Sequence, residues 1–255
     1  MKKYVILLLA ALPAVLPAPP AWAQGQTPAL AERSNLPPIP SYEVHRAKTA
    51  PSIDGRLDDT AWADARPVTF IFPWENQTGK KQKTTARLLW DNDNLYVAYD
   101  CEDSDITATR TERDQPTYMD DAVEIFIGPP GVKNLYLGLE MNARGALYDY
   151  LYPFPQRFIK NYNLPGVRIA TSMRGTLNNS ADQDQGWSLE VAIPWRAFAD
   201  LIDNPVPKTG DHWIADMNRW DGTRSDRVLS QWSDSGLVRA DPHYPDRFGQ
   251  LVFLE

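Results

Sequence analysis

Residues 117–128 read TYMDDAVEIFIG and bring three carboxylates close together. Apolar residues alternate with other residues from position 123 to 127, a period of two that is typical of a strand with one face in a core. Asp120 and Asp121 lie beside this expected strand, and Glu124 lies on its second face. Carboxylates in such a place can accept hydrogen bonds, bind a cation or, in pairs, perform acid–base chemistry. Glu124 is therefore the first candidate for a functional residue.

Most signatures of catalysis are absent from the sequence. The histidines, His45, His212 and His243, form no H-E-x-x-H motif, and the chain has neither a G-x-S-x-G motif nor a phosphate-binding loop. Cys101 occupies an apolar position in an alternating segment, so we expect a buried structural thiol. A glycosidase needs two carboxylates roughly 5 to 10 Å apart, and Glu124 with a second acid would provide them only by chance of folding. We expect no catalytic residue, and hydrolysis of O-glycosyl bonds stays open as an alternative.

Short strands separated by turns are the elements expected to position these residues. The DNDN sequence at 91–94 favours a tight reversal, which predicts a hairpin between the strands on either side of it. Helical turns are expected only at 57–65 and 194–202. The expected strands cover 86–90, 95–101, 123–128, 134–142, 145–152, 167–173, 187–194, 212–220 and 248–254. Many short strands with few helices predict an all-β fold, an antiparallel β-sandwich of the jelly-roll type.

The N-terminal region has the features of a secretory signal peptide. Lys2 and Lys3 precede an apolar run, and the sequence AWA ends at Ala23. We expect cleavage after Ala23 and a periplasmic or extracellular protein. Residues 24–40 are rich in proline and lack apolar periodicity, which predicts an extended linker, so a single domain is expected over 41–255.

The charge of the chain limits its partners. Lys2 and Lys3 are the only charges in the signal peptide, so their removal changes the formal net charge from −7 to −9. A nucleic-acid partner is not expected, because phosphates require a basic surface. No segment is apolar over the roughly 20 residues that a membrane span needs. Cys101 is the only cysteine, so no internal disulfide forms. Separately, we expect a monomer.

Five segments occur in the order that is seen in family 9 carbohydrate-binding modules. They are IDGRLDDTAW (53–62), ARLLWDNDNLYVAYDCED (86–103), DDAVEIFIGP (120–129), GWSLEVAIPW (186–195) and QWSDSGLVRADPHYPDRFGQLVF (231–253). The sequence thus resembles this family over nearly all of residues 42–254. The resemblance implies a jelly-roll-like sandwich that binds poly- or oligosaccharides of the xylan or cellulose type, often at chain ends. It further implies a role beside glycoside hydrolases in carbohydrate catabolism, and often structural calcium.

The resemblance also implies a set of carbohydrate-binding residues. An aromatic residue before the D-x-V-E-I-F motif and another in the W-S-D motif sandwich the sugar in the family, and they match Tyr118 and Trp232. Glu124 would accept hydrogen bonds from sugar hydroxyls between the two rings. Glu140 occupies a position that is basic in some relatives, and Asn142 matches an asparagine of the family. Tyr118 replaces a tryptophan of the family, and this departure together with that at Glu140 leaves the identity of the sugar open.

Simpler interpretations of the same residues also remain open. Glu124 and Glu190 both fit solvated glutamates on an open sheet, and Trp232 fits a core residue as well as a stacking residue. Trp74 is expected to be exposed, where it would extend the site. Trp62 and Trp187 are expected in the core.

Two cofactors need separate consideration. The acidic runs DNDN and IDGRLDD match no calcium-loop spacing, so we name no calcium ligand and expect only turn chemistry at DNDN. A related sandwich family holds haem b through a methionine with a histidine or lysine, which keeps haem as an alternative. The candidate ligands are Met119, Met141, Met217, His212 and His243.

Overall fold

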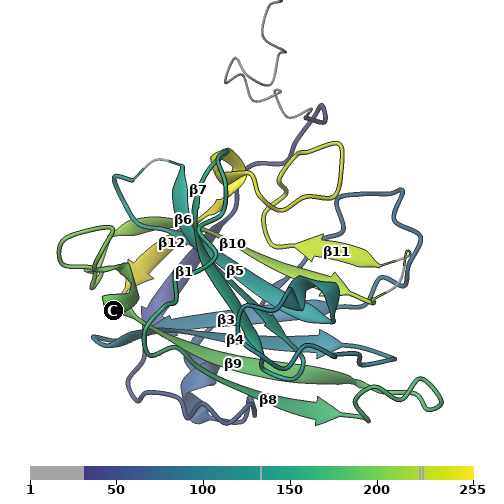
Figure 1. Cartoon of the computed structure of the whole chain (residues 1–255). Coiled ribbons are helices and arrows are strands. Elements are labelled where there is room, and N and C mark those ends of the chain that lie inside the picture. Colours follow the sequence, from purple (N-terminus) through teal and green to yellow (C-terminus); the bar gives the residue numbers. More distant parts are fainter. Residues whose placement is uncertain (1–31, 133, 224, 226) are drawn as a thin grey trace, which may run out of the picture. The chain divides into compact units, whose positions relative to one another are not determined.

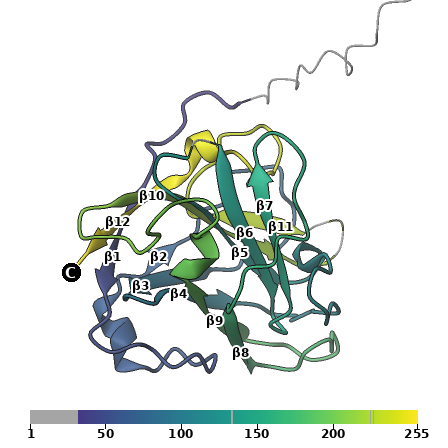
Figure 2. The same ribbon diagram turned by 60° about the vertical axis from the view of Figure 1, so that its left-hand side comes forward.

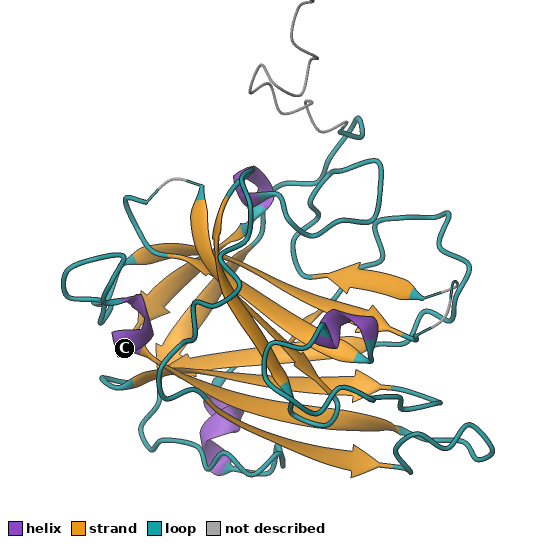
Figure 3. Ribbon diagram, viewed as in Figure 1, coloured by secondary structure: helices purple, strands orange, loops and turns teal. Residues whose placement is uncertain are grey.

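The computed structural model describes residues 32–132, 134–223, 225 and 227–255. The expected signal peptide and the first part of the expected linker lie outside these residues. Strands make up most of the regular structure of the described chain, and the helical segments are single 3₁₀ turns (Figure 3). Among the described residues, no helix has the length and apolar character needed to cross a membrane.

The strands have the following bounds: β1 (Ser41–Arg46), β2 (Val68–Thr69), β3 (Thr84–Trp90), β4 (Asn94–Glu102), β5 (Ala122–Gly128), β6 (Leu135–Asn142), β7 (Leu147–Pro153), β8 (Arg168–Arg174), β9 (Gly186–Pro194), β10 (His212–Asp221), β11 (Val228–Gln231) and β12 (Gly249–Leu254). The 3₁₀ turns are η2 (Thr60–Asp64), η3 (Thr117–Met119), η4 (Trp195–Phe198) and η5 (Pro245–Arg247). Each expected strand is present within two residues of its expected ends, and both expected helical turns are present as 3₁₀ turns.

The strands form one hydrogen-bonded path in the order β7-β6-β5-β10-β12-β1-β3-β4-β9-β8 (Figure 1), with β11 beside β10 and β2 beside β3. Neighbouring strands are antiparallel, except that β1 is parallel to both β12 and β3. The inner faces of the two halves of this path share one hydrophobic core, which makes a β-sandwich. The predicted fold class is confirmed.

Alternation along β5 explains how this sandwich positions a functional face. Val123, Ile125 and Ile127 enter the main core, together with residues of β4 and β9 such as Val97 and Val191. Because side chains alternate, Glu124 and its neighbours of the same parity lie on the outer face of the sheet.

The hairpin expected around DNDN is formed by β3 and β4, which pair from Thr84 with Cys101 to Trp90 with Leu95. The carboxylate of Asp91 accepts the backbone N–H groups of Asp93 and Asn94, each at 2.8 Å. This is the turn chemistry expected for these residues. Cys101 is fully buried, and burial raises the pKa of its thiol to about 12.

The outer face of β9 is covered, which corrects the interpretation of Glu190 as a solvated residue. Glu190 is fully buried. Its carboxylate accepts the backbone N–H groups of Asp54 at 3.1 Å and Gly55 at 2.9 Å, and the indole N–H of Trp62 at 2.8 Å. A buried acid therefore holds the segment before β2 against the sheet.

The described part of the expected linker is in contact with the domain. Glu32 bridges to Leu237, and the Arg33 guanidinium pairs with Asp234 and donates to the carbonyl of Pro73 at 3.0 Å. Contacts of this kind are not those of a free tether. Residues from Glu32 onward thus contact the domain, and the boundary at residue 41 stays a prediction.

Candidate functional site

A pocket of about 280 Å³ lies on the outer face of the sheet and contains three of the five expected site residues. Glu124 of β5 and Glu140 of β6 contribute its acidic groups, and Tyr118 of η3 contributes an aromatic ring. Figure 2 shows β5 and β6 side by side, with β7 beyond β6. The remaining lining residues are Tyr148, Phe158, Lys160, Trp220, Ala240, Asp241, Pro242 and His243.

Polar side chains in and beside the pocket lie in a row across the strands. Asn218 of β10 is the register partner of Glu124, Glu124 is that of Glu140, and Glu140 is that of Tyr148. Register partners of antiparallel strands have Cβ atoms about 5 Å apart on the same face. One row of four adjacent strands thus brings an amide, two carboxylates and a phenol together.

Both glutamates are buried and incompletely hydrogen-bonded. Glu124 is 1% exposed and Glu140 is 3% exposed. The Oε2 atom of each has no hydrogen-bond partner among the described residues. Buried polar atoms without a partner are rare in folded proteins and need an explanation. Here the explanation is that both carboxylates line a pocket that a polar ligand can enter.

Burial dominates the acid–base properties of this pair. It raises the pKa of Glu124 to about 8, although the nearby charge of Arg227 opposes the increase. It also raises the pKa of Glu140 well above its usual range, and the charge of Glu124 adds to this effect. Two close carboxyl groups in a poorly solvated site resist double ionisation. The pair therefore retains a proton near neutral pH.

The Tyr118 ring is positioned by the short turn η3. The Thr117 hydroxyl of that turn donates to the carbonyl of Glu140 at 2.9 Å, which fixes η3 on β6. The Arg227 guanidinium donates to the carbonyl of Tyr118. The Tyr118 ring is half-buried, and its centroid lies 6.0 Å from that of Tyr148. Tyr118 is thus an aromatic wall beside the two acids.

Asn142 lies in a separate polar network beneath η3 and does not line the pocket. Its Nδ2 atom donates to the carbonyl of Arg110 and to Asp120, both at 2.9 Å. Its Oδ1 atom accepts the N–H groups of Arg144 at 3.2 Å and Ala146 at 2.9 Å. Both amide hydrogens and both lone pairs are engaged. These contacts give Asn142 a structural role in the turn between β6 and β7, and its role in sugar binding stays a prediction.

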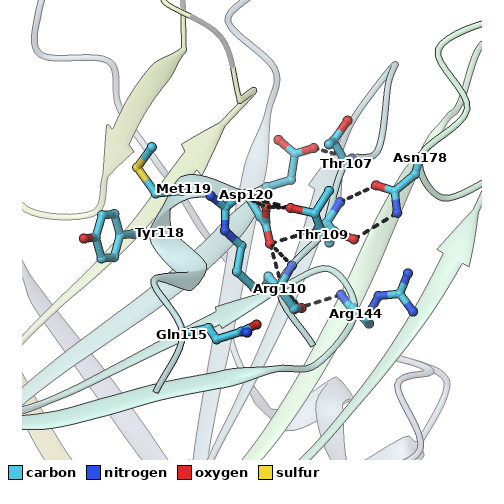
Figure 4. A network of polar contacts seen from close by, with 12 residues as sticks. Thr107, Thr109, Arg110, Gln115, Tyr118, Met119, Asp120, Arg144 and Asn178 are labelled. Carbon is cyan, nitrogen blue, oxygen red and sulfur yellow. Dashed lines mark hydrogen bonds and ion pairs between the residues drawn. The ribbon is translucent and has the colours of Figure 1, made fainter. Parts of the chain in front are cut away.

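Asp120 is the centre of this network (Figure 4). Its carboxylate accepts the backbone N–H of Arg110 at 2.9 Å and the guanidinium of the same residue at 2.6 Å. Burial alone would raise the pKa of Asp120, but these hydrogen bonds and that of Asn142 outweigh burial and lower it. In Figure 4 the ring of Tyr118 points away from the network. Asp120 therefore anchors η3 and leaves the tyrosine free to face the pocket.

Trp232 does not face Tyr118 across the sugar site as expected, because the structure places it in the main core. Its side chain is 7% exposed and meets the ring of Tyr42 edge-on, with centroids 6.4 Å apart. The indole also packs on Gly249, where an added Cβ would lie 2.5 Å from ring atoms. Trp74 is likewise buried, at 2% exposure, and its indole N–H donates to the carbonyl of Leu237 at 2.8 Å. Neither tryptophan lines the pocket.

Two aromatic residues that strands contribute to the pocket are absent from the site expected from the sequence. Trp220 is on the outer face of β10, because its register partner is Ala122 and that of Asn218 is Glu124. Tyr148 begins a set of tyrosines at every second position of β7. Spacing by two places such rings on one face of a strand, and this signal would have identified Tyr148. Phe158 and the residues 240–243 come from loops that carry no such pattern.

The one group of acids in the described chain with the spacing of a metal site is Asp103, Asp121 and Asp221, whose ligand atoms lie within 4.8 Å of one another. The buried guanidinium of Arg219 already lies among them, with its Nη2 atom 2.9 Å from Asp103 and 3.1 Å from Asp221. Asp121 accepts two backbone N–H groups, from Thr107 and Gly222. An internal cation and hydrogen bonds thus satisfy these acids. The group does not fit the calcium that the resemblance implies.

The candidate haem ligands lie in different environments. Met141 and Met217 are in the main core, whereas Met119 is 39% exposed. His212 is exposed at the start of β10. His243 lines the pocket, where burial lowers its pKa to about 3 and its Nδ1 atom lies 2.8 Å from the hydroxyl of Tyr136.

Comparisons with known proteins agree with the geometry of the sandwich. The chain is 30% identical over 151 residues to "Endo-1,4-beta-xylanase A" of Thermoanaerobacterium saccharolyticum, covering 58% of this chain and 11% of that protein. It is 28% identical over 154 residues to "Exoglucanase XynX" of Acetivibrio thermocellus, covering 59% of this chain and 12% of that protein. The chain thus spans about a tenth of the length of these relatives.

Solved structures share the fold at low sequence identity. A putative carbohydrate-binding protein from Bacteroides uniformis superposes with a TM-score of 0.73 at 20% identity, covering 84% of this chain and 99% of that one. A family 9 module from Caldicellulosiruptor kristjanssonii in complex with cellotriose gives 0.58 at 17% identity, with 84% and 93% covered. The family model for the carbohydrate family 9 binding domain-like proteins matches residues 53–255. The chain therefore belongs to the carbohydrate family 9 binding domain-like family.

Proposed function

We propose that this protein binds the end of a poly- or oligosaccharide chain of the xylan or cellulose type in the pocket between Tyr118 and Trp220. The observation that carries the proposal is the pair of buried carboxylates, Glu124 and Glu140, whose unpartnered Oε2 atoms line a pocket with aromatic walls. Carboxylates accept hydrogen bonds from sugar hydroxyls, and aromatic rings pack on the apolar faces of a pyranose. The small volume suits one terminal sugar ring.

The family membership and the relatives support this proposal. The two enzymes named above contain a segment similar to this chain, and a structural neighbour of the same family holds cellotriose. We propose that the domain described here performs the corresponding binding step. Exported by its signal peptide, it would retain oligosaccharides for glycoside hydrolases outside the cytoplasm. N-terminal sequencing of the mature protein should then begin at Gln24.

Calorimetry with the mature protein tests the binding proposal. Cello- and xylo-oligosaccharides are expected to bind with dissociation constants of about 1 μM to 1 mM, as is usual for small polar ligands. Tyr118→Ala should weaken binding by roughly 1.5 kcal/mol or more. Glu124→Gln, which keeps the shape of the side chain, should cost about 1 to 3 kcal/mol.

Two matched controls lie outside the pocket. Glu43→Gln changes an exposed glutamate of β1, and Tyr162→Ala removes a tyrosine that hydrogen-bonds Asp200. Both variants should bind as the wild type does. A folded wild-type protein that binds none of these sugars would refute the proposed function. A reducing-end assay on the same samples should detect no hydrolysis.

A further inference from the structure

The Glu124–Glu140 pair makes the pocket unusually acidic for a site that binds neutral sugars. The two residues are direct register partners on β5 and β6, and both are more than nine-tenths buried. An ionised carboxylate can only accept hydrogen bonds. With Asp241 at the same pocket, three acids face the ligand. The pocket thus presents three acidic side chains to a ligand.

The cations that the structure describes near the pair offset this acidity only in part. Within the described residues, neither glutamate forms an ion pair. Arg227 lowers the pKa of Glu124 and Lys160 lowers that of Glu140, but burial outweighs both. Lys160 itself is exposed at the rim. The other titratable groups that face the pair are Tyr118, Tyr148, Tyr150, Asp216, Asp241 and His243. None of these groups is a cation near neutral pH.

The aromatic walls also suit a positive charge. The guanidinium carbon of Arg227 lies 4.2 Å from the centroid of Trp220, and the Lys160 ammonium lies 5.9 Å from that of Tyr148. Two walls of the pocket thus already attract cations. The face of an aromatic ring carries negative electrostatic potential, and the attraction is larger where the cation is desolvated. A cation inside the pocket would meet such rings and two carboxylates together.

We propose that this pocket selects a sugar with a protonated primary amine, a hexosamine at the end of a glycan chain, over the corresponding neutral sugar. An ammonium group has three N–H donors and no acceptor, which complements the unpartnered Oε2 atoms of Glu124 and Glu140. Its charge also supplies the cation that the pair lacks. The inference rests on the proposed function and names the ligand class for the same site.

Binding of an ammonium group should change the protonation of the Glu124–Glu140 pair. Near neutral pH the free pair holds at least one proton, which stays on a carboxyl group when a neutral sugar binds. An ammonium favours the doubly ionised pair, so each carboxyl O–H bond still present breaks and its proton leaves to the solvent. Amine binding should therefore release a proton, and affinity should rise between about pH 5 and pH 7. The neutral sugar should show neither effect.

Calorimetry with D-glucosamine, D-glucose and N-acetyl-D-glucosamine in phosphate buffer provides the test. At pH 7 we expect glucosamine to bind roughly tenfold more tightly than glucose, a difference of about 1.4 kcal/mol. The acetylated sugar, whose nitrogen carries no charge, should not share this gain. Repeating the titration in buffers of different ionisation enthalpy should reveal the released proton. This measurement needs only the wild-type protein.

Glu140→Gln is the decisive variant because it keeps size and shape while removing one charge. It should weaken the binding of both sugars and abolish the preference, so that glucosamine and glucose bind with equal affinity, with an unchanged circular dichroism spectrum. Equal binding of glucose and glucosamine by the wild type would overturn the inference and leave the proposed function intact. Absence of binding by every sugar would overturn both. Equally tight binding of ethylamine would show a generic amine site and would also overturn it.

Discussion

The family motif indicated Trp232 as the second aromatic residue of the sugar site, but the structure places Trp220 at the pocket. Both tryptophans are close to strands of the same sheet, and composition does not distinguish their roles. The alternation of side chains puts Trp220 on the outer face of β10 with Glu124 of β5, whereas Trp232 packs over Gly249 in the core. A shift of one residue in a strand moves a side chain to the other face. Motif matching alone therefore could not decide between them.

The two tryptophans should respond oppositely to truncation. Trp232→Ala should lower the free energy of unfolding by about 3 to 5 kcal/mol, because it leaves a cavity in the core. Trp220→Ala should have a small effect on stability, since this ring is half-buried, and should weaken sugar binding by roughly 1 kcal/mol or more. Urea unfolding and calorimetry measure the two quantities. If the Trp232→Ala protein is as stable as the wild type and binds sugar more weakly, Trp232 contacts the sugar and the assignment to the core is wrong.

Cys101 gives a second test at this scale. Its thiol is fully buried, and its pKa of about 12 keeps it protonated at neutral pH. The thiolate is the reactive form, so Ellman's reagent should label it slowly in native buffer and rapidly in denaturant. Rapid labelling of the native protein would contradict the described packing of β4.

Most strands, but not all of them, were predictable from the local sequence pattern. Alternating apolar residues predicted the strands β3 to β10 and β12, because each has a clear inner face. Three strands were missed, β1, β2 and β11. β2 has two residues, and β1 pairs with β12 from Ser41 with Gln250 to His45 with Leu254. Such pairing between distant ends of the chain leaves no local signal.

The pocket was partly predictable for the same reason. Glu124 and Tyr118 lie in or beside a strong strand pattern, and the resemblance indicated their role. Glu140 departs from some relatives in its charge, but its position directly opposite Glu124 depends on the β5–β6 register. The loop residues Asp241 and His243 are brought in by tertiary packing. Register and loop conformation therefore account for what the sequence did not reveal.

The segment held by Glu190 permits a prediction at the scale of elements. Glu190→Leu removes three hydrogen bonds, to Asp54, Gly55 and Trp62, and leaves these donors without a partner. We expect a loss of at least about 3 kcal/mol in the free energy of unfolding. The indole of Trp62 should also become more accessible to a quencher of tryptophan fluorescence. Glu102→Leu, at the exposed end of β4, is the control and should leave stability within about 0.5 kcal/mol.

At the scale of the whole molecule, residues that the sequence assigns to a linker contact the domain. Arg33 contacts Asp234 and the Pro73 carbonyl, and the Arg247 guanidinium donates to the carbonyl of Pro37 at 2.6 Å. A protein that starts at Ser41 should therefore melt several degrees below one that starts at Gln24, because about 1 to 3 kcal/mol of contacts is lost. Arg33→Ala should reproduce part of the decrease. Equal melting temperatures of the two proteins would show that residues 24–40 add no stability and that the domain begins near residue 41.

The stability of the whole molecule should depend on pH through its buried acids. The pKa of Glu124 rises from 4.5 to about 8 on folding, and the pKa values of Glu140 and Asp216 also rise. A raised acid pKa means that the folded state holds its proton more tightly. The stabilisation is therefore complete below the unfolded pKa of 4.5 and is lost as pH rises through about 8. Asp120, whose pKa is lowered, acts in the opposite direction and only in the acid range.

Differential scanning calorimetry between pH 5 and pH 9 would measure this dependence. The melting temperature should fall as pH rises across this range, because a tenfold difference in proton affinity between the folded and unfolded states corresponds to about 1.4 kcal/mol. Glu124→Gln cannot ionise, so its curve should be flatter and should cross above that of the wild type at alkaline pH. Glu43→Gln, an exposed change in β1, should follow the wild type. A wild-type melting temperature that rises steadily from pH 5 to pH 9 would mean that the pair is ionised and solvated in the folded protein. The proton release that is expected on amine binding would then be absent.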